Sequence, residues 1–301
     1  MTVITSSKFI SALTSTSKMT NGFFLNHDPE GSMVIYEFHK NRPVTDFDYH
    51  QIYYNSIPVQ SNLLTPEHAE WVAKAQEVRE KHIDGNNNRL YIEWDNPLGG
   101  ELQAPAVFLD FGPWWSTPEA GCPTEKVWNE MLLEVSQAAG FDFSLEDIPQ
   151  SPDVKPFYKV TFGFFPARDH TVPWFRVACA YSVKDCPSFA ESMGFSTKWF
   201  DKFDLNKYCE TCLISYNISK EGVTKPAAEM ILKTLHQGDV PPEFSEFSEL
   251  HHGGKELILK HHGEHLDRLS LCHFKVTLTD ESYEKQEAKM YMFGHVKSSH
   301  G

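Results

Sequence analysis

The sequence predicts an α+β protein in which antiparallel strands form a barrel that helices cover from outside. The first observation is the segment KPFYKVTFGFFP at 155–166, where an apolar face alternates with a face that carries a lysine, a hydroxyl group and a glycine. Such a strand suits a barrel that packs outward against helices and has polar groups inside. The second observation is that hairpins alternate with helices, without the Gly-rich turns of a parallel βαβ sheet.

Strands are predicted wherever β-rich composition coincides with a period of two. These segments are 33–39, 45–54, 89–94, 105–111, 157–165, 174–182, 208–218, 256–260, 266–278 and 286–297. The turns KNRP and DNPLGG join the first four into two hairpins. In the second strand, Phe47 and Tyr49 lie on one face, and Asp48 and His50 lie on the other.

Helices are predicted where an apolar stripe recurs with helical spacing. They are 65–82, 123–139, 187–193, 197–203 and 226–236, with a short helical turn at 144–148. Thr65-Pro66 supplies a capping hydroxyl group and a first-turn proline for the first of them. Gly238 and the pair Pro241-Pro242 end the last. The histidine-rich stretch 251–265 contains glycines and short polar runs, so we expect a solvated loop there and no metal site.

Length and charge limit the function classes. The 301 residues are interpreted as one domain over 31–301, preceded by a tail at 1–30 that includes a possible first helix. A net charge of −14 argues against nucleic-acid binding, because phosphate neutralisation needs a basic surface. We expect no membrane partner and a cytoplasmic location, because no apolar run is long enough to span a bilayer. The Ser/Thr-rich, acid-free N-terminus leaves a transit peptide open.

Five predicted strands each carry one cation on the less apolar face, which is unexpected in an acidic protein. These cations are Lys159, Arg176, Lys260, Arg268 and Lys289. If they point into one interior, they form a polyanion site, since arginine offers phosphate a planar fork and lysine a point charge. The alternative is that they lie on solvated faces of a half-exposed sheet, and alternation alone does not decide between the two.

Several motifs, taken in order, resemble those of the soluble aromatic prenyltransferases of the ABBA or PT-barrel type, the group that prenylates phenols, naphthalenes and phenazines. YKVTFGFFP at 158–166 resembles their lysine-bearing strand, and LDRL at 266–269 resembles the strand whose arginine binds diphosphate. EGSMVIY at 30–36 with TDFD at 45–48 resembles their first hairpin, and Lys289 before Tyr291 resembles the lysine of the last strand. Residues 55–105 lack a counterpart: either they are an insertion, or the helix and strand predicted there mean that the first repeat is placed wrongly.

This resemblance implies a ten-stranded antiparallel barrel built from ααββ repeats, which transfers a dimethylallyl or geranyl group from its diphosphate to a small aromatic acceptor in secondary metabolism. The reaction is a carbocation-like electrophilic substitution. The implied diphosphate-binding residues are Lys159, Arg176, Lys260, Arg268, Lys289 and Tyr291. The implied pocket for the acceptor and the prenyl chain comprises Thr161, Trp174, Thr211, Ser215, Ser270 and Phe293.

Asp48 and His295 are the expected catalytic residues. Asp48 is also the expected Mg²⁺ ligand if the reaction depends on Mg²⁺, but the DDxxD signature of chain-elongating prenyl synthases is absent. The competing hypothesis is a non-catalytic β-barrel that binds a hydrophobic or aromatic small molecule. Only unpaired interior cations favour the enzyme, because a neutral ligand has no need of them.

Overall fold

The fold was examined in a computed structural model of the 301-residue chain. It describes residues 33–54, 89–95, 106–110, 125–154, 158–166, 174–202, 205–224, 226–236, 240–279 and 285–297, and four helical positions, 74, 77, 78 and 81. The side chains of 51–54, β3, β4 and β5, and of some further positions within these ranges, are outside the description. The expected tail at 1–30 also lies outside the described residues.

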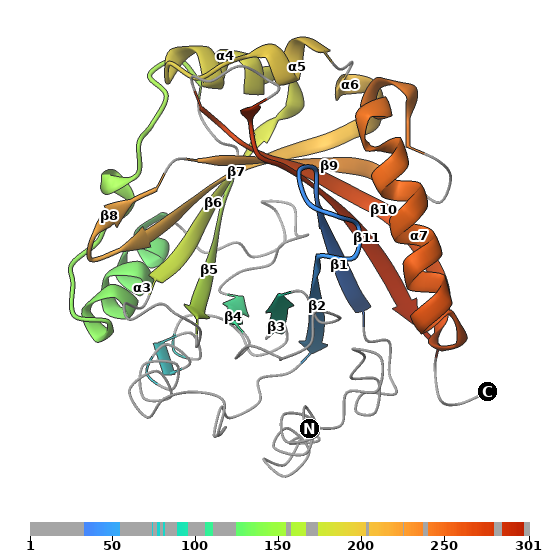
Figure 1. Cartoon of the computed structure of the whole chain (residues 1–301). Coiled ribbons are helices and arrows are strands. Elements are labelled where there is room, and N and C mark those ends of the chain that lie inside the picture. The colour runs from blue at the N-terminus through green and yellow to red at the C-terminus, as the bar shows by residue number, and fades with distance from the viewer. Residues whose placement is uncertain are drawn as a thin grey trace.

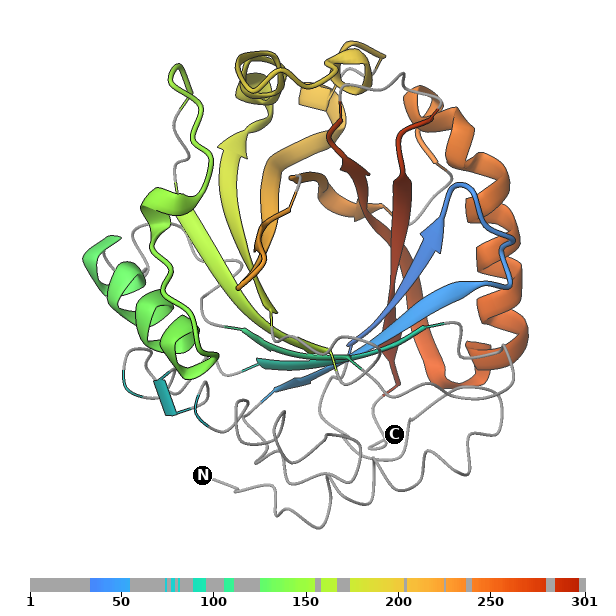
Figure 2. The same cartoon turned by 60° about the vertical axis from the view of Figure 1, so that its left-hand side comes forward.

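Antiparallel strands dominate the described chain (Figure 1). They are β1 (Met33–His39), β2 (Phe47–Tyr54), β3 (Arg89–Asp95), β4 (Ala106–Asp110), β5 (Tyr158–Pro166), β6 (Trp174–Ser182), β7 (Cys209–Ser219), β8 (Gly222–Val223), β9 (Ala227–His236), β10 (Leu266–Thr277) and β11 (Ala288–Val296). The hydrogen-bonded order is β6-β5-β4-β3-β2-β1-β11-β10-β9-β7-β8, and β6 also pairs with β7. The ladder therefore returns to its starting strand, and Figure 2 shows the strands curling around a common axis.

Helices lie outside this curled sheet, as Figures 1 and 2 show. They are α3 (Glu125–Ala138), α4 (Cys186–Ser192), α5 (Lys198–Lys202), α6 (Leu205–Tyr208) and α7 (Ser248–His262), with 3₁₀ turns η3 (Leu145–Asp147), η4 (Val183–Asp185), η5 (Pro242–Phe247) and η6 (Gly263–His265). The arrangement confirms the predicted α+β class with helices around an antiparallel sheet. No helix among the described residues combines the length and the apolar character that crossing a bilayer requires.

The apolar core lies between the outer face of the sheet and these helices. Tyr36 on β1 is fully buried there, and its hydroxyl group is 2.9 Å from Nδ1 of His262 on α7. The ring of Phe38, also on β1, lies against Gly254 of α7, where a Cβ atom would come within 2.8 Å of the ring. Since side chains alternate along a strand, Glu37 and His39 point the other way, into the interior of the barrel.

Cross-strand pairing shows which residues of the other strands face the interior, because directly paired residues share a face of the sheet. Glu37 pairs with Asp48 on β2 and Tyr291 on β11, and His39 pairs with Lys289. Further round, interior pairs join Lys289 to Lys275, Lys275 to Glu229, and Arg176 to Asn217. Polar and charged side chains therefore gather on the interior face.

Two predicted elements are wrong. Residues 226–236 were expected as a helix, but 227–236 form β9, which pairs with both β7 and β10. AAEMILKTLH is rich in good helix formers, but tertiary pairing on both edges overrides this weak local preference. The expected strand 256–260 and loop 251–265 instead belong largely to α7, in which Gly254 permits close contact with Phe38 of β1. Residues 89–95 of the supposed insertion form β3, an integral strand of the sheet.

Candidate active site

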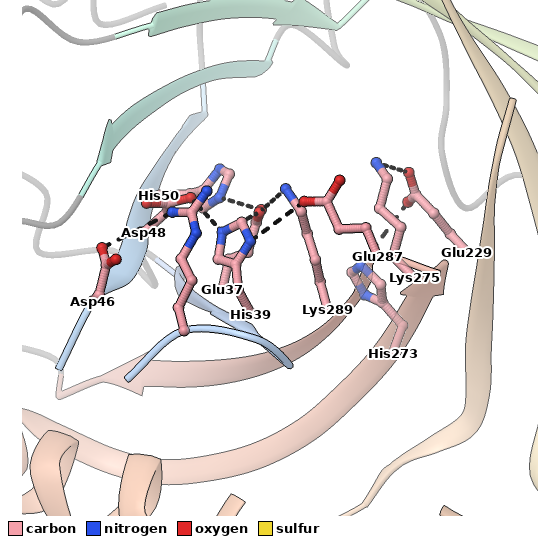
Figure 3. Close-up of polar contacts among 11 residues, drawn as sticks. Glu37, His39, Asp46, Asp48, His50, Glu229, His273, Lys275, Glu287 and Lys289 are labelled. Carbon is pink, nitrogen blue, oxygen red and sulfur yellow. Dashed lines mark hydrogen bonds and ion pairs between the residues drawn. The ribbon is translucent and has the colours of Figure 1, made fainter. Parts of the chain in front are cut away.

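Glu37 is the centre of one charged cluster in the barrel interior (Figure 3). Its carboxylate accepts from Nζ of Lys289 at 2.5 Å and from Nε2 of His50 at 3.1 Å. Nε2 of His39 lies 3.4 Å away. Burial raises the pKa of Glu37, but Lys289 and the hydrogen bond from His50 outweigh burial and hold it well below its usual value. Glu37 is therefore ionised, and it balances the charge of Lys289.

His39 bridges three carboxylates in the same cluster. Its Nε2 is 2.9 Å from Asp48 and its Nδ1 is 3.6 Å from Glu287, a half-exposed residue just before β11. Burial lowers the pKa of His39, but the hydrogen bond to Asp48 and the ion pair with Glu287 raise it above the ordinary value. The contact with His39 likewise lowers the pKa of Glu287.

Glu229 on β9 is the centre of a second cluster. It is 6% exposed, and its Oε1 accepts from Nζ of Lys275 at 2.6 Å and from Oγ of Ser215 at 3.4 Å. His273 lies 3.9 Å from the other carboxylate oxygen. Burial raises the pKa of Glu229, but Lys275, His273 and Arg176 lower it to about 2. Burial also lowers the pKa of His273, to about 4, so this imidazole is neutral at pH 7.

Two contacts join the clusters into one polar patch. Lys275 and Lys289 are direct cross-strand partners on β10 and β11. At the next pair on the same face of this ladder, the ring of His273 stacks on the ring of Tyr291. The ring centroids are 4.0 Å apart and the ring planes are inclined by 17°. Burial and the nearby Arg176 lower the pKa of Lys275. Burial, Glu37 and Glu229 raise the pKa of Tyr291, so its phenol stays protonated and can donate a hydrogen bond.

The structure brings five predicted site residues into or beside this patch. They are Asp48, Arg176, Ser215, Lys289 and Tyr291. Nε of Arg176 donates to the Asn217 side chain at 2.9 Å. Thr211 lies on the same face of β7 as Ser215, four residues before it, and pairs with Ser182 on β6. These residues remain candidates for substrate contacts.

Four other candidates lie further along β10 and β11, where Phe293 is two residues and His295 four residues beyond Tyr291. His295 is six residues beyond Lys289, which corresponds to about 20 Å of strand. There, Nη2 of the exposed Arg268 donates to Nε2 of His295 at 2.8 Å, and burial and Arg268 lower the pKa of His295. The remaining two, Ser270 and Phe293, are buried partners of each other in the ladder. The predicted convergence of Arg268 with Lys289 is therefore not observed.

Lys260 was predicted wrongly. It is exposed in the last turn of α7, outside the barrel, because the segment is a helix. The side chains of Lys159, Thr161 and Trp174 lie outside the description. In the backbone register, Lys159 pairs with Cys179 and Thr161 with Val177, and both partners are buried in the core beneath the helices. The roles expected for Lys159, Thr161 and Trp174 stay predictions.

Sequence reasoning missed Glu37, Glu229, His273 and Lys275. Alternation placed Glu37 opposite its apolar neighbours but offered no reason to select it. Glu229 was missed because its segment, 226–236, was predicted to be a helix. On β10, a register irregularity between Leu271 and His273 shifts the period of two, so that His273 and Lys275 join the interior face. No local sequence signal marks this irregularity.

Asp48 lies in a cluster of possible metal ligands, but the groups beside it do not suit Mg²⁺. Ligand atoms of Glu37, His39 and Asp48 lie within 4.8 Å of one another. Mg²⁺ prefers oxygen ligands in an octahedron, whereas here an imidazole nitrogen lies between the carboxylates and the Lys289 ammonium already neutralises Glu37. The cluster fits a set of ion pairs better than a Mg²⁺ site.

Two of the solved structures that resemble this chain are dimethylallyl tryptophan synthases, and both likenesses are distant. No protein-family model matches the chain, and no curated protein matches it. A 6-dimethylallyl tryptophan synthase is 9% identical, with a TM-score of 0.48 over 86% of this chain and 80% of that one. The 5-dimethylallyl tryptophan synthase of Streptomyces coelicolor, solved with DMASPP and Trp, is 10% identical, with a TM-score of 0.49 over 97% of this chain and 88% of that one. At this level of similarity, the chain's own residues must support any conclusion about function.

Proposed function

We propose that this protein is an aromatic prenyltransferase, which binds an allylic diphosphate and a small aromatic acceptor inside a PT barrel of ααββ repeats that spans residues 31–301. The observation that carries the proposal is the convergence of Lys275, Lys289 and Arg176 on one interior patch from three strands. We place the protein in the cytoplasm and in secondary metabolism. Dimethylallyl and geranyl diphosphate are the expected donors.

In this proposal the basic patch stabilises the departing diphosphate. The C–O bond to the allylic carbon breaks, and negative charge grows on the diphosphate oxygens beside Lys275 and Lys289. Preorganised cations in a buried site stabilise such developing charge without further reorganisation. Tyr291 adds a neutral hydroxyl donor, because its raised pKa keeps the phenol protonated. Charge-assisted hydrogen bonds of this kind contribute about 1.5–3 kcal/mol each.

The aromatic rings beside the patch suit an allylic cation. The stacked pair of His273 and Tyr291 presents π surface next to the lysines, and π faces stabilise positive charge. The acceptor ring forms the new bond to the allylic carbon and then loses a proton. An interior carboxylate is the expected proton acceptor, because His295 lies about 20 Å along the strand from Lys289. The products are the prenylated aromatic compound, pyrophosphate and one proton.

A second candidate is the non-catalytic binding protein. One observation favours it: the two interior lysines whose side chains the structure describes are each paired with a glutamate, Lys275 with Glu229 and Lys289 with Glu37. An interior with such balanced charge can also accept a neutral ligand. The two candidates therefore differ in whether diphosphate compounds bind and react.

Incubation with dimethylallyl or geranyl diphosphate and a panel of phenols, naphthalenes and indoles tests the proposal, with products read by mass spectrometry and released pyrophosphate assayed in parallel. Wild type should form a product. Lys289→Met should lose it, with about 10- to 150-fold weaker donor binding. The control Lys260→Met should behave as wild type, because Lys260 is exposed outside the barrel. Lack of product and of pyrophosphate release across the panel would favour the binding protein.

A further inference from the structure

The arrangement of like charges on β10 and β11 is unusual. Lys275 and Lys289 face each other directly across the ladder on the interior side. Like charges in this position repel and destabilise a sheet. Each ammonium is held by its own glutamate, Glu229 at 2.6 Å and Glu37 at 2.5 Å. The result is a pair of adjacent cations whose charge two buried carboxylates neutralise.

An anion that enters between the lysines has to compete with these carboxylates. Glu37 is held by three groups, Lys289, His50 and His39. Glu229 depends mainly on Lys275, with a longer hydrogen bond from Ser215 and a contact of 3.9 Å to His273. Glu229 is therefore the easier of the two to separate from its lysine. A buried carboxylate that loses its cation beside a bound anion strongly favours the neutral, protonated form.

We propose that a phosphate or diphosphate anion binds between Lys275 and Lys289 by displacing Glu229 from Lys275, and that Glu229 takes up one proton as it does so. This deepens the proposed function and rests on it. The proton comes from solvent, and the neutral carboxyl group can donate its hydrogen to the anion or to Ser215. Glu229 thus acts as a built-in counter-ion that the substrate replaces.

The charged and titratable groups around Glu229 support exchange at this residue. Those that act on it or are acted on by it from neighbouring strands are Lys275 and His273 on β10, Arg176 on β6, Tyr291 on β11 and Cys212 on β7, while Lys289 on β11 acts on Lys275. The described interior residues of β7 near it, Leu213, Ser215 and Asn217, are uncharged. The imidazole of His273 is neutral at pH 7 and the phenol of Tyr291 is protonated and uncharged. Neither side chain therefore carries a positive charge that could neutralise Glu229 in place of a proton.

Calorimetry with inorganic pyrophosphate tests the exchange. Titrations at pH 6, 7 and 8, each in two buffers with different ionisation enthalpies, give both the affinity and the number of protons taken up. Wild type should take up about one more proton than Glu229→Gln, and its affinity relative to the variant should fall up to about tenfold per pH unit as pH rises. At pH 8 the variant should bind more tightly than wild type, because no ionised carboxylate competes for Lys275. Pyrophosphate's own titration cancels in this comparison.

Glu256→Gln is the control with the same chemical change, since Glu256 is exposed on α7, outside the barrel. It should keep the wild-type proton uptake. Difference infrared spectroscopy of wild type provides a reading that does not depend on the variant folding: a protonated carboxyl band should appear when pyrophosphate binds. Binding with equal proton uptake in wild type and Glu229→Gln, or without the infrared band, would overturn the exchange alone. Failure of pyrophosphate to bind wild type would overturn the proposed function as well.

Discussion

Replacement of Glu229 by glutamine should destabilise the unliganded protein by about 3 kcal/mol at pH 7, because it leaves the Lys275 ammonium buried without its counter-ion. Lys275 is 8% exposed and its Nζ is 2.6 Å from Glu229. Removal of one member of a buried ion pair costs about 3–5 kcal/mol, most of it from the charge that remains. The amide keeps the size of the side chain, so the change isolates the charge.

The lowered pKa of Glu229 gives the same magnitude for the loss of stability in Glu229→Gln. A buried carboxyl group whose pKa falls from 4.5 to about 2 on folding stabilises the folded state by about 3 kcal/mol at neutral pH. Because the folded-state pKa is depressed, this stabilisation is fully present above pH 4.5 and is lost as pH falls towards 2. Glu229→Gln should therefore differ most from wild type near neutral pH and progressively less below pH 4.5.

Urea and thermal unfolding of Glu229→Gln, Lys275→Met and the double variant form a thermodynamic cycle. Each single change should lower Tm by roughly 6–12 °C, at about 2–4 °C per kcal/mol for a protein of this size class. The double variant should recover much of the loss, since it leaves neither charge unpaired. Single effects below about 0.5 kcal/mol, or a double variant that equals the sum of the singles, would refute a tightly coupled buried pair.

Three further predictions follow from other contacts. Arg268→Ala should leave the pyrophosphate affinity within about twofold of wild type in calorimetry, because the anion site at Lys289 lies about 20 Å along the strand, beyond the Debye screening length. A large loss of affinity would place Arg268 in the anion site. Gly254→Ala should cost about 1–3 kcal/mol in urea unfolding, since its Cβ would lie 2.8 Å from the Phe38 ring, and an unchanged midpoint would show that the helix can shift freely. Folding raises the pKa of His39, so its stabilisation is complete below the ordinary value of 6.5 and disappears as pH rises through the folded-state pKa; His39→Gln should remove that part of the stability–pH curve, and identical curves would contradict the assignment.

Most strands could be predicted from alternation because the outer face of each strand packs on a continuous core. β1 and β6 were predicted at their observed bounds, and β2, β7, β10 and β11 within a few residues. β9 could not be predicted, because its composition favours a helix and only its pairing with β7 and β10 makes it a strand. α7 was missed because a glycine pair usually weakens a helix, whereas here Gly254 allows the helix to approach Phe38.

The candidate site was predictable only in part. Arg176, Lys289 and Tyr291 were selected because they alternate with apolar residues, and they do lie on the interior face. The alternation of β5 is a weaker guide, because this strand is apolar on both faces at several positions, and the role of Lys159 stays a prediction. Arg268 illustrates a second limit: a correct face does not show how far along the barrel a residue lies.

The amino-acid sequence by itself determined the α+β class, the antiparallel strands and an interior that collects polar groups, because alternation and local composition encode which face of each strand is buried. Only the tertiary structure decided which charges meet. The pairing of Glu229 with Lys275 and of Glu37 with Lys289 depends on strand register, on an irregularity in β10 and on which strands become neighbours. Those are properties of residues far apart in the chain, and a period of two along one strand carries no information about them.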